Sequence, residues 1–209
     1  EQLGASQGLL DTTNAALKKV SDTMKDVRTV LTKLAEDGLT TEQRTQYNAQ
    51  YTVLRGQIQS FVNDATYNGK TLLGAAPGGT DDRKIVRTEK ADQITISSTD
   101  KTTLVVAAVP ATQAAALAAL GASGDFKTVE AAINTAMNQY GNDSKTVAGQ
   151  ISFNKEKADA LESGLGALVD ADLAKESAKL QSLQIRQQLG TQSLSIANQA
   201  PQSLLSLFR

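Results

Sequence analysis

Apolar residues recur at alternating steps of three and four along the first part of the chain, from Leu10 onward. This spacing places them on one face of an α-helix and predicts a seam that packs against other helices. Asp11 or Thr12 is a candidate N-cap for the helix, and Gly38 is a candidate for its C-terminal end. The residues of this first rod seam are Leu17, Val20, Met24, Val27, Leu31 and Leu34.

A second stripe with the same alternation follows a short polar break. Thr40 or Thr41 is placed to cap its helix, and Asn68–Gly69 predicts a turn that ends it. The apolar positions of this stripe are Tyr47, Tyr51, Leu54, Ile58, Phe61 and Ala65. Because two such helices leave their seams partly uncovered, we expect residues 1–70 to form N-side rod helices that need further partner helices.

The composition changes across residues 71–124, which we interpret as a variable region. Glycines and a proline at 74–79 predict a loop. Ile94–Ser97 alternates as a strand does, and Thr102–Val109 is a second run rich in β-forming residues. The polar residues 98–101 between these runs predict a β-hairpin. The alanine-rich stretch Ala111–Leu120 predicts a short helix.

Residues 125–168 predict the C-side rod helix. It begins near Asp125, and Gly141–Asp143 favours a local disturbance. Three heptads of four-three spacing follow, with Asn154 as a single polar seam residue of the kind that fixes register in coiled coils. An ordinary amphipathic core helix fits the same pattern. The apolar members of this second rod seam include Ile151, Ala158, Leu161 and Leu165, flanked by Val147 and Leu168.

Residues 169–209 predict a C-terminal assembly helix. Asp170 and Asp172 favour a helix start because carboxylates are stabilised near the positive end of the helix dipole. The last residues form an apolar cluster that a monomer has little reason to expose. The predicted interface residues for assembly are Leu173, Leu180, Leu183, Leu194, Ala197, Leu204, Leu205, Leu207 and Phe208. All segments together predict a mainly α fold: an elongated antiparallel helical bundle or coiled-coil rod, with a small insertion that contains a β-hairpin and a C-terminal helix.

The composition narrows the class of protein further. Aromatic residues make up only 4%, which suits helices packed along narrow aliphatic seams. The 21 Lys and Arg balance the 22 Asp and Glu, so neither nucleic acid nor an anionic membrane is an expected partner. The longest strongly apolar stretch, Leu104–Leu120, contains Pro110 and polar residues, so no transmembrane helix is expected.

The sequence lacks the residue types that enzymes most often use for catalysis. The chain has no His and no Cys, which removes the common nucleophile–base pairs and the common transition-metal ligands. The glycines at 74–79 lack the Lys of a phosphate-binding loop. Carboxylate pairs such as Asp170 and Asp172 are better explained by helix capping than by acid–base catalysis or calcium binding. We therefore expect no enzyme, no cofactor and no metal site.

Four stretches carry a resemblance to one family, the bacterial flagellins, particularly those of alphaproteobacterial type. The C-terminus Ser195–Arg209 is similar to flagellin C-termini, and Leu168–Ser177 to the entry into their terminal helix. Arg55–Ile58 and Tyr67–Lys70 resemble the N-side core helix and the turn after it. The resemblance implies a filament subunit for swimming motility whose residues 1–70 and 125–168 form a rod. It also implies that the family's own N-terminal segment is missing from this sequence.

The same resemblance implies partners and a location. Other flagellin subunits would pack on the terminal helix, a cytoplasmic export chaperone would cover that helix before export, and flagellar cap and junction proteins would meet the filament. The protein would leave the cell through the flagellar secretion channel and reside in the extracellular filament.

Two other classes of function stay open at this point. A hook–filament junction protein shares the rod architecture. A flagellin-like cell-surface protein that binds polysaccharide would use the charged residues Asp81, Asp82, Arg83, Lys84 and Arg87, although an ordinary solvated loop is the favoured explanation for them.

Overall fold

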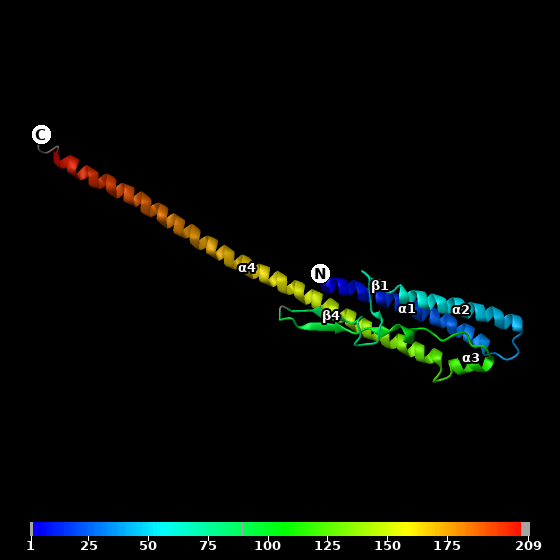
Figure 1. Cartoon of the computed structure of the whole chain (residues 1–209). Helices are drawn as coiled ribbons and strands as arrows, with labels where there is room; N and C mark the ends of the chain where they lie inside the picture. Colours follow the sequence, from blue (N-terminus) through cyan, green and yellow to red (C-terminus); the bar gives the residue numbers. More distant parts are fainter. Residues whose placement is uncertain (1, 89, 206–209) are drawn as a thin grey trace. The chain divides into compact units, whose positions relative to one another are not determined.

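The chain is mainly α-helical, as the spacing of its apolar residues predicts. The structure, a computed structural model, describes residues 2–88 and 90–205, with side chains as far as Ala197 (Figure 1). Its helices are α1 (Gln2–Leu34), α2 (Thr41–Asn63), α3 (Gln113–Leu120) and α4 (Asp125–Leu205). The chain divides into two units, residues 1–153 and 154–209. We call the first the compact unit.

Helix α1 begins earlier than its predicted caps. Asp11 and Thr12 lie inside the helix, where Thr12 Oγ1 donates a hydrogen bond to the Gly8 carbonyl at 2.8 Å. A Thr that bonds back to the preceding turn sits in a helix interior, so the predicted capping role is wrong. The end is close to the prediction, because α1 stops at Leu34 and Gly38 adopts a left-handed φ of 78°.

Helix α2 begins and ends with recognisable local signals. The Thr40 side chain accepts a hydrogen bond from the Gln43 N–H, and the Gln43 side chain accepts one from the Thr40 N–H, which makes a capping box. The helix stops at Asn63, before the predicted turn. Asn68 and Gly69, with φ of 50° and 70°, instead turn the chain between β1 (Thr66–Tyr67) and β2 (Lys70–Thr71). Two residues with positive φ are what a tight hairpin requires.

The predicted hairpin across residues 98–101 is wrong, and a different one forms. Strand β5 (Gln93–Ile96) pairs antiparallel with β4 (Arg83–Val86), which precedes it in the chain. The segment Thr102–Val109 is not a strand, because Asp100 Oδ1 accepts hydrogen bonds from the N–H and the hydroxyl of Thr102 and caps the 3₁₀ helix η1 (Lys101–Leu104). Two remaining strands, β3 (Leu73–Gly74) and β6 (Thr99–Asp100), pair in parallel.

Helix α4 is one continuous element. It begins at Asp125 as predicted, but neither the disturbance at Gly141–Asp143 nor a new helix start at Asp170 is present. Tyr140 and Val147 are both fully buried, so the stretch around Gly141 is held on each side by packing. The glycines that precede it, Gly164 and Gly166, do not end the helix, so the Asp170 carboxylate lies in a helix interior and caps nothing. The boundary that we expected at residue 169 therefore has no counterpart in the helix.

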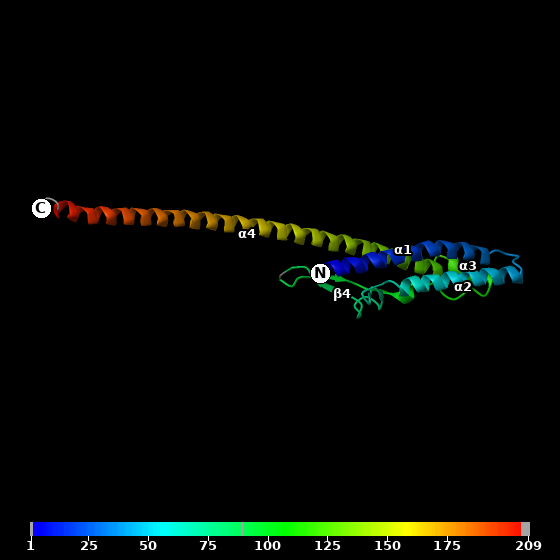
Figure 2. The ribbon, with the colours of Figure 1, turned by 90° about the horizontal axis from the view of Figure 1, so that it is seen from above.

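The compact unit is an antiparallel helical bundle with a small β insertion. Helices α1 and α2 lie side by side in both views (Figures 1 and 2), and α1 also meets the beginning of α4. Gln7 bonds Ser144 at 2.8 Å near one end, and Arg28 pairs with Glu130 near the other, so α1 and α4 run in opposite directions. The Arg28 guanidinium also lies 5.3 Å from the centroid of the Phe126 ring.

Buried Tyr140 joins this helical core to the β insertion. Its hydroxyl donates to the Leu72 carbonyl at 2.9 Å and lies 2.8 Å from Thr99 Oγ1. Leu72 and Thr99 flank or belong to the β3–β6 pair, so one phenol fixes that pair against α4. The mainly α fold, with a small β insertion and a C-terminal helix, is confirmed.

Candidate assembly surface

The first rod seam lies inside the compact unit. All six of its predicted residues, from Leu17 to Leu34, are at most 3% exposed. They belong to one buried core with residues of α2, α3 and the beginning of α4, which together supply the partner helices that the sequence requires. This seam holds the subunit together and is not available to another molecule.

The second rod seam does not form within the described chain. Ile151 is 36% exposed, Leu161 65% and Leu165 62%, and Ala158 is also exposed. Within the described chain no element covers them, because from residue 158 to 197 no side chain is buried. Their role as a rod seam stays a prediction.

The same exposure continues along the predicted assembly helix. Leu173, Leu180, Leu183 and Leu194 are between 53% and 64% exposed, and Ala197 is exposed. Leu204 and Leu205 belong to α4, but their side chains lie outside the described residues, as do Leu207 and Phe208 altogether. We call the exposed face of α4 the terminal stripe. Its members are Leu161, Leu165, Leu168, Leu173, Leu180, Leu183 and Leu194.

A second, shorter apolar face escaped the sequence prediction. Ile185, Leu189 and Ile196 are 56%, 57% and 66% exposed. Steps of four and seven place them on one face, turned away from the terminal stripe by more than a third of a helical turn. The sequence carries this signal, because the spacing of the three residues is helical. The end of α4 therefore offers apolar surface in two directions.

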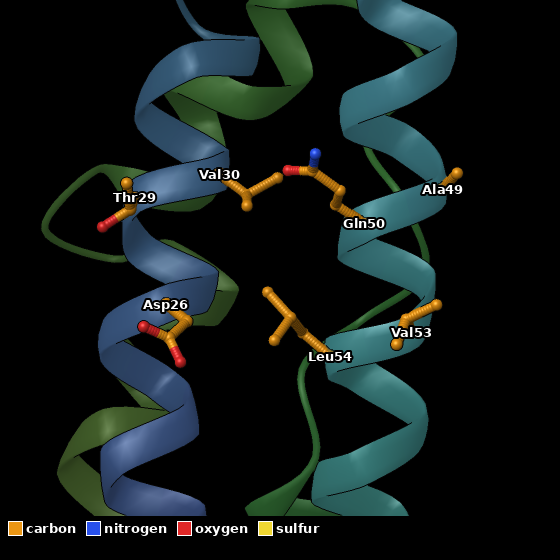
Figure 3. Close-up of a pocket in the computed structure, with 7 residues that line it drawn as sticks. All are labelled: Asp26, Thr29, Val30, Ala49, Gln50, Val53 and Leu54. Atoms are coloured by element: carbon orange, nitrogen blue, oxygen red, sulfur yellow. The ribbon is translucent and has the colours of Figure 1, made fainter.

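A separate groove lies between α1 and α2 in the compact unit. It encloses about 530 Å³, and its walls include Val30, Leu54 and the 60% exposed Val53 (Figure 3). Asp26, Thr29 and Gln50 add a carboxylate, a hydroxyl and an amide. Among the described residues that line the groove, these groups provide no nucleophile–base pair.

The shifted ionisable groups serve structure. Two hydrogen bonds from Ser98, one from its N–H and one from its hydroxyl, lower the pKa of Asp82, helped by the Gly78 N–H. Burial raises the pKa of Tyr140 to about 12 and also raises the pKa of Asp143. Among the described residues no cluster of three potential metal ligands occurs. In the same part of the chain, every helix is too polar or too short to traverse a bilayer.

Two protein-family models match this chain, one in its N-terminal part and one in its C-terminal part. The family described as the bacterial flagellin N-terminal helical region matches residues 2–76, and the bacterial flagellin C-terminal helical region matches residues 127–208. A flagellin of Brucella melitensis is 35% identical over 224 residues, which span all of this chain and 77% of that protein. Flagellin FljM of Caulobacter vibrioides is 36% identical over 213 residues, all of this chain and 76% of that protein. This chain is a bacterial flagellin.

A solved structure agrees at the level of the fold. The crystal structure of a Bacillus cereus flagellin superposes with a TM-score of 0.63 at 18% identity, over 72% of this chain and 86% of that one. As a flagellin the chain is a structural subunit of the extracellular flagellar filament, and its relatives are alphaproteobacterial, as the resemblance implied. These matches give no support to a junction protein or a polysaccharide-binding surface protein.

Proposed function

We propose that the terminal stripe of α4 is the surface through which this flagellin packs against other copies in the filament. One observation carries the proposal: all seven leucines of the terminal stripe are exposed, and no side chain from residue 158 to 197 is buried. The buried seam of α1 shows what the same spacing does when a partner helix is present.

The energetics favour a partner over an isolated helix. Burying one fully exposed Leu side chain contributes about 1.5–3 kcal/mol, so covering most of the stripe is needed to offset the roughly 4–15 kcal/mol that association costs. A lone helix in water gains little stability from propensity alone, because helices in proteins are held mainly by packing of an apolar face. Gly164, Gly166 and Gly190 each weaken this helix by about 1 kcal/mol relative to Ala. The helix therefore reaches its full stability in the assembly.

The same surface explains the other partners that the resemblance implies. A row of exposed leucines promotes aggregation before assembly, so a cytoplasmic export chaperone that covers the terminal stripe protects the subunit on its way to the secretion channel. Cap and junction proteins would meet the same helix at the filament ends. No catalytic step belongs to this role, since the chain has neither His nor Cys.

Filament formation tests the assembly surface. In cells that build their filament from this subunit, Leu180→Asp or Leu194→Asp should abolish filaments seen by electron microscopy, because each places a carboxylate in a buried apolar contact. Gln188→Asp is the matched control, since Gln188 lies on the polar face of the same helix and its variant should assemble normally. Normal filaments from both Leu variants would refute the proposal.

Amide exchange tests the chaperone contact separately. In the purified monomer, residues 161–197 should exchange rapidly, and the cell's flagellin export chaperone should slow that exchange. Strong protection in the monomer alone would mean that the terminal stripe is already covered and would exclude it as a chaperone site.

A further inference from the structure

A small pocket opens in the compact unit where α1, the β1–β2 hairpin and β4 meet. It encloses about 290 Å³. Leu9 and Ile85, each 3% exposed, and the partly exposed Tyr67 form its apolar walls. The Tyr67 ring lies directly against α1 because Gly8 has no side chain: a Cβ there would come 2.7 Å from Tyr67 Cζ.

The rim of this pocket is cationic. Lys70, Arg83 and Lys84 line it, and none of the described residues that line it carries a carboxylate. Within the described part of the chain, buried Arg83 Nε has no hydrogen-bond partner. Asp81 and Asp82, which precede Arg83 in the chain, accept hydrogen bonds from other groups: Asp81 Oδ2 from the Ala75 N–H at 2.7 Å, and Asp82 from Ser98 and the Gly78 N–H. An occupant should therefore combine apolar groups with negative charge.

The chain itself contains a segment with this chemistry. Residues 158–174 of α4 carry four carboxylates and neither Lys nor Arg: Asp159, Glu162, Asp170 and Asp172. All of these residues are exposed. Val169 and Leu173, 49% and 61% exposed, lie one turn apart on one face, and Asp170 and Asp172 lie on either side of that face.

We propose that residues 169–173 of one subunit dock in the cationic pocket of a second copy. Val169 and Leu173 cover the walls formed by Leu9, Tyr67 and Ile85, while the two aspartates meet the cations of the rim. Apolar burial supplies the affinity, and the charges fix the register and exclude a misaligned copy. The inference rests on the proposed assembly of α4 and adds a contact between α4 and the compact unit of a neighbour.

Disulfide trapping tests this contact cleanly, because the natural chain has no Cys. Two single variants, Ser6→Cys at the pocket and Val169→Cys on α4, would be co-expressed in cells that assemble this subunit, and their filaments oxidised. Both substitutions leave the charges intact. A disulfide-linked dimer that needs both variants is expected. Replacing Ser6→Cys by Thr52→Cys, an exposed position on α2 outside the pocket, should give no dimer.

Charge reversal distinguishes docking in the pocket from chance proximity. Adding Lys84→Glu to the Ser6→Cys subunit should abolish the dimer through repulsion, and adding Asp172→Lys to the other subunit should restore it. Filaments without the dimer, or a dimer that ignores Lys84→Glu, would overturn the docking proposal alone. In a chain that carries both cysteines, a disulfide confined to the monomer would show that a subunit fills its own pocket and would also overturn it. Absence of filaments from the unsubstituted subunit would count against the assembly surface instead.

Discussion

A Leu→Ala substitution should act differently on the two apolar stripes of this flagellin. On α1 it should lower the free energy of unfolding, and on α4 it should impair filament assembly. Leu17 in α1 is fully buried, whereas Leu180 in α4 is 55% exposed. Leu17→Ala removes packed side-chain atoms and leaves a cavity, which should lower the free energy of unfolding by about 2–5 kcal/mol. Leu180→Ala removes atoms that touch mainly water, so it should change that free energy by less than about 0.5 kcal/mol.

Tyrosine fluorescence is the natural assay for this comparison. The chain has four Tyr and no Trp, and all four, Tyr47, Tyr51, Tyr67 and Tyr140, lie in the compact unit. Guanidinium unfolding followed by tyrosine emission therefore reports the compact unit alone, while circular dichroism also reports the exposed length of α4. A lower midpoint is expected for Leu17→Ala and an unchanged midpoint for Leu180→Ala.

The comparison has a clear refutation. Equal losses of stability in the two variants would mean that Leu180 is packed inside the monomer, and the reasoning from its exposure would fail. The two variants should rank the other way in filament assembly. Leu180→Ala should assemble poorly, whereas Leu17→Ala should assemble under conditions well below its unfolding midpoint.

Three further outcomes follow from single hydrogen-bonded groups. Tyr140→Phe should lower the free energy of unfolding, measured by calorimetry at neutral pH, by about 1 kcal/mol. Because folding raises the pKa of Tyr140 to about 12, the natural chain should lose stability as the pH rises from about 10 towards 12. The variant should lose less stability over the same range. The pKa of Asp82 is lowered in the folded state, so its stabilisation is present above about pH 4 and is lost as pH falls further; Asp82→Asn should flatten this acid dependence in urea titrations. Thr40→Ala removes the N-cap of α2 and should cost about 1 kcal/mol in the same titrations, whereas Thr41→Ala, one residue along, should cost little.

Local signals account for the parts of the fold that sequence reasoning predicted. The capping chemistry at Thr40, the left-handed Gly38, the tight turn at Asn68–Gly69 and the start of α4 at Asp125 each depend on residues within a few positions. Helical spacing also placed the leucines of α4 on apolar faces, Leu161 and Leu165 on the predicted rod seam and Leu173 to Leu194 on the predicted assembly interface. The local signals gave wrong predictions at Thr12 and at Asp170. Both residues were expected near a helix start, and both lie inside a longer helix, α1 and α4.

Strand pairing could not be predicted, because it depends on a choice between distant segments. Ile94 and Ile96 fit a strand, but nothing local selects residues 83–86 as their partner over residues 102–109. The capping of η1 by Asp100 and the burial of Ser98 against Asp82 decide that choice. The cationic pocket could not be predicted either, because its lining residues come from three elements that are separate in the sequence.

Helical spacing in the sequence is enough to show that this flagellin is helical and which residues share each helical face, and the motifs of the chain indicate its family. Which faces form the core and which form the surface depends on how the helices pack. Leu17 and Leu180 each belong to an apolar stripe of a helix, yet the Leu17 side chain is buried and the Leu180 side chain is 55% exposed. Periodicity specifies a face within one helix, but burial requires a second element opposite it, and in this chain those elements cover only part of the apolar length.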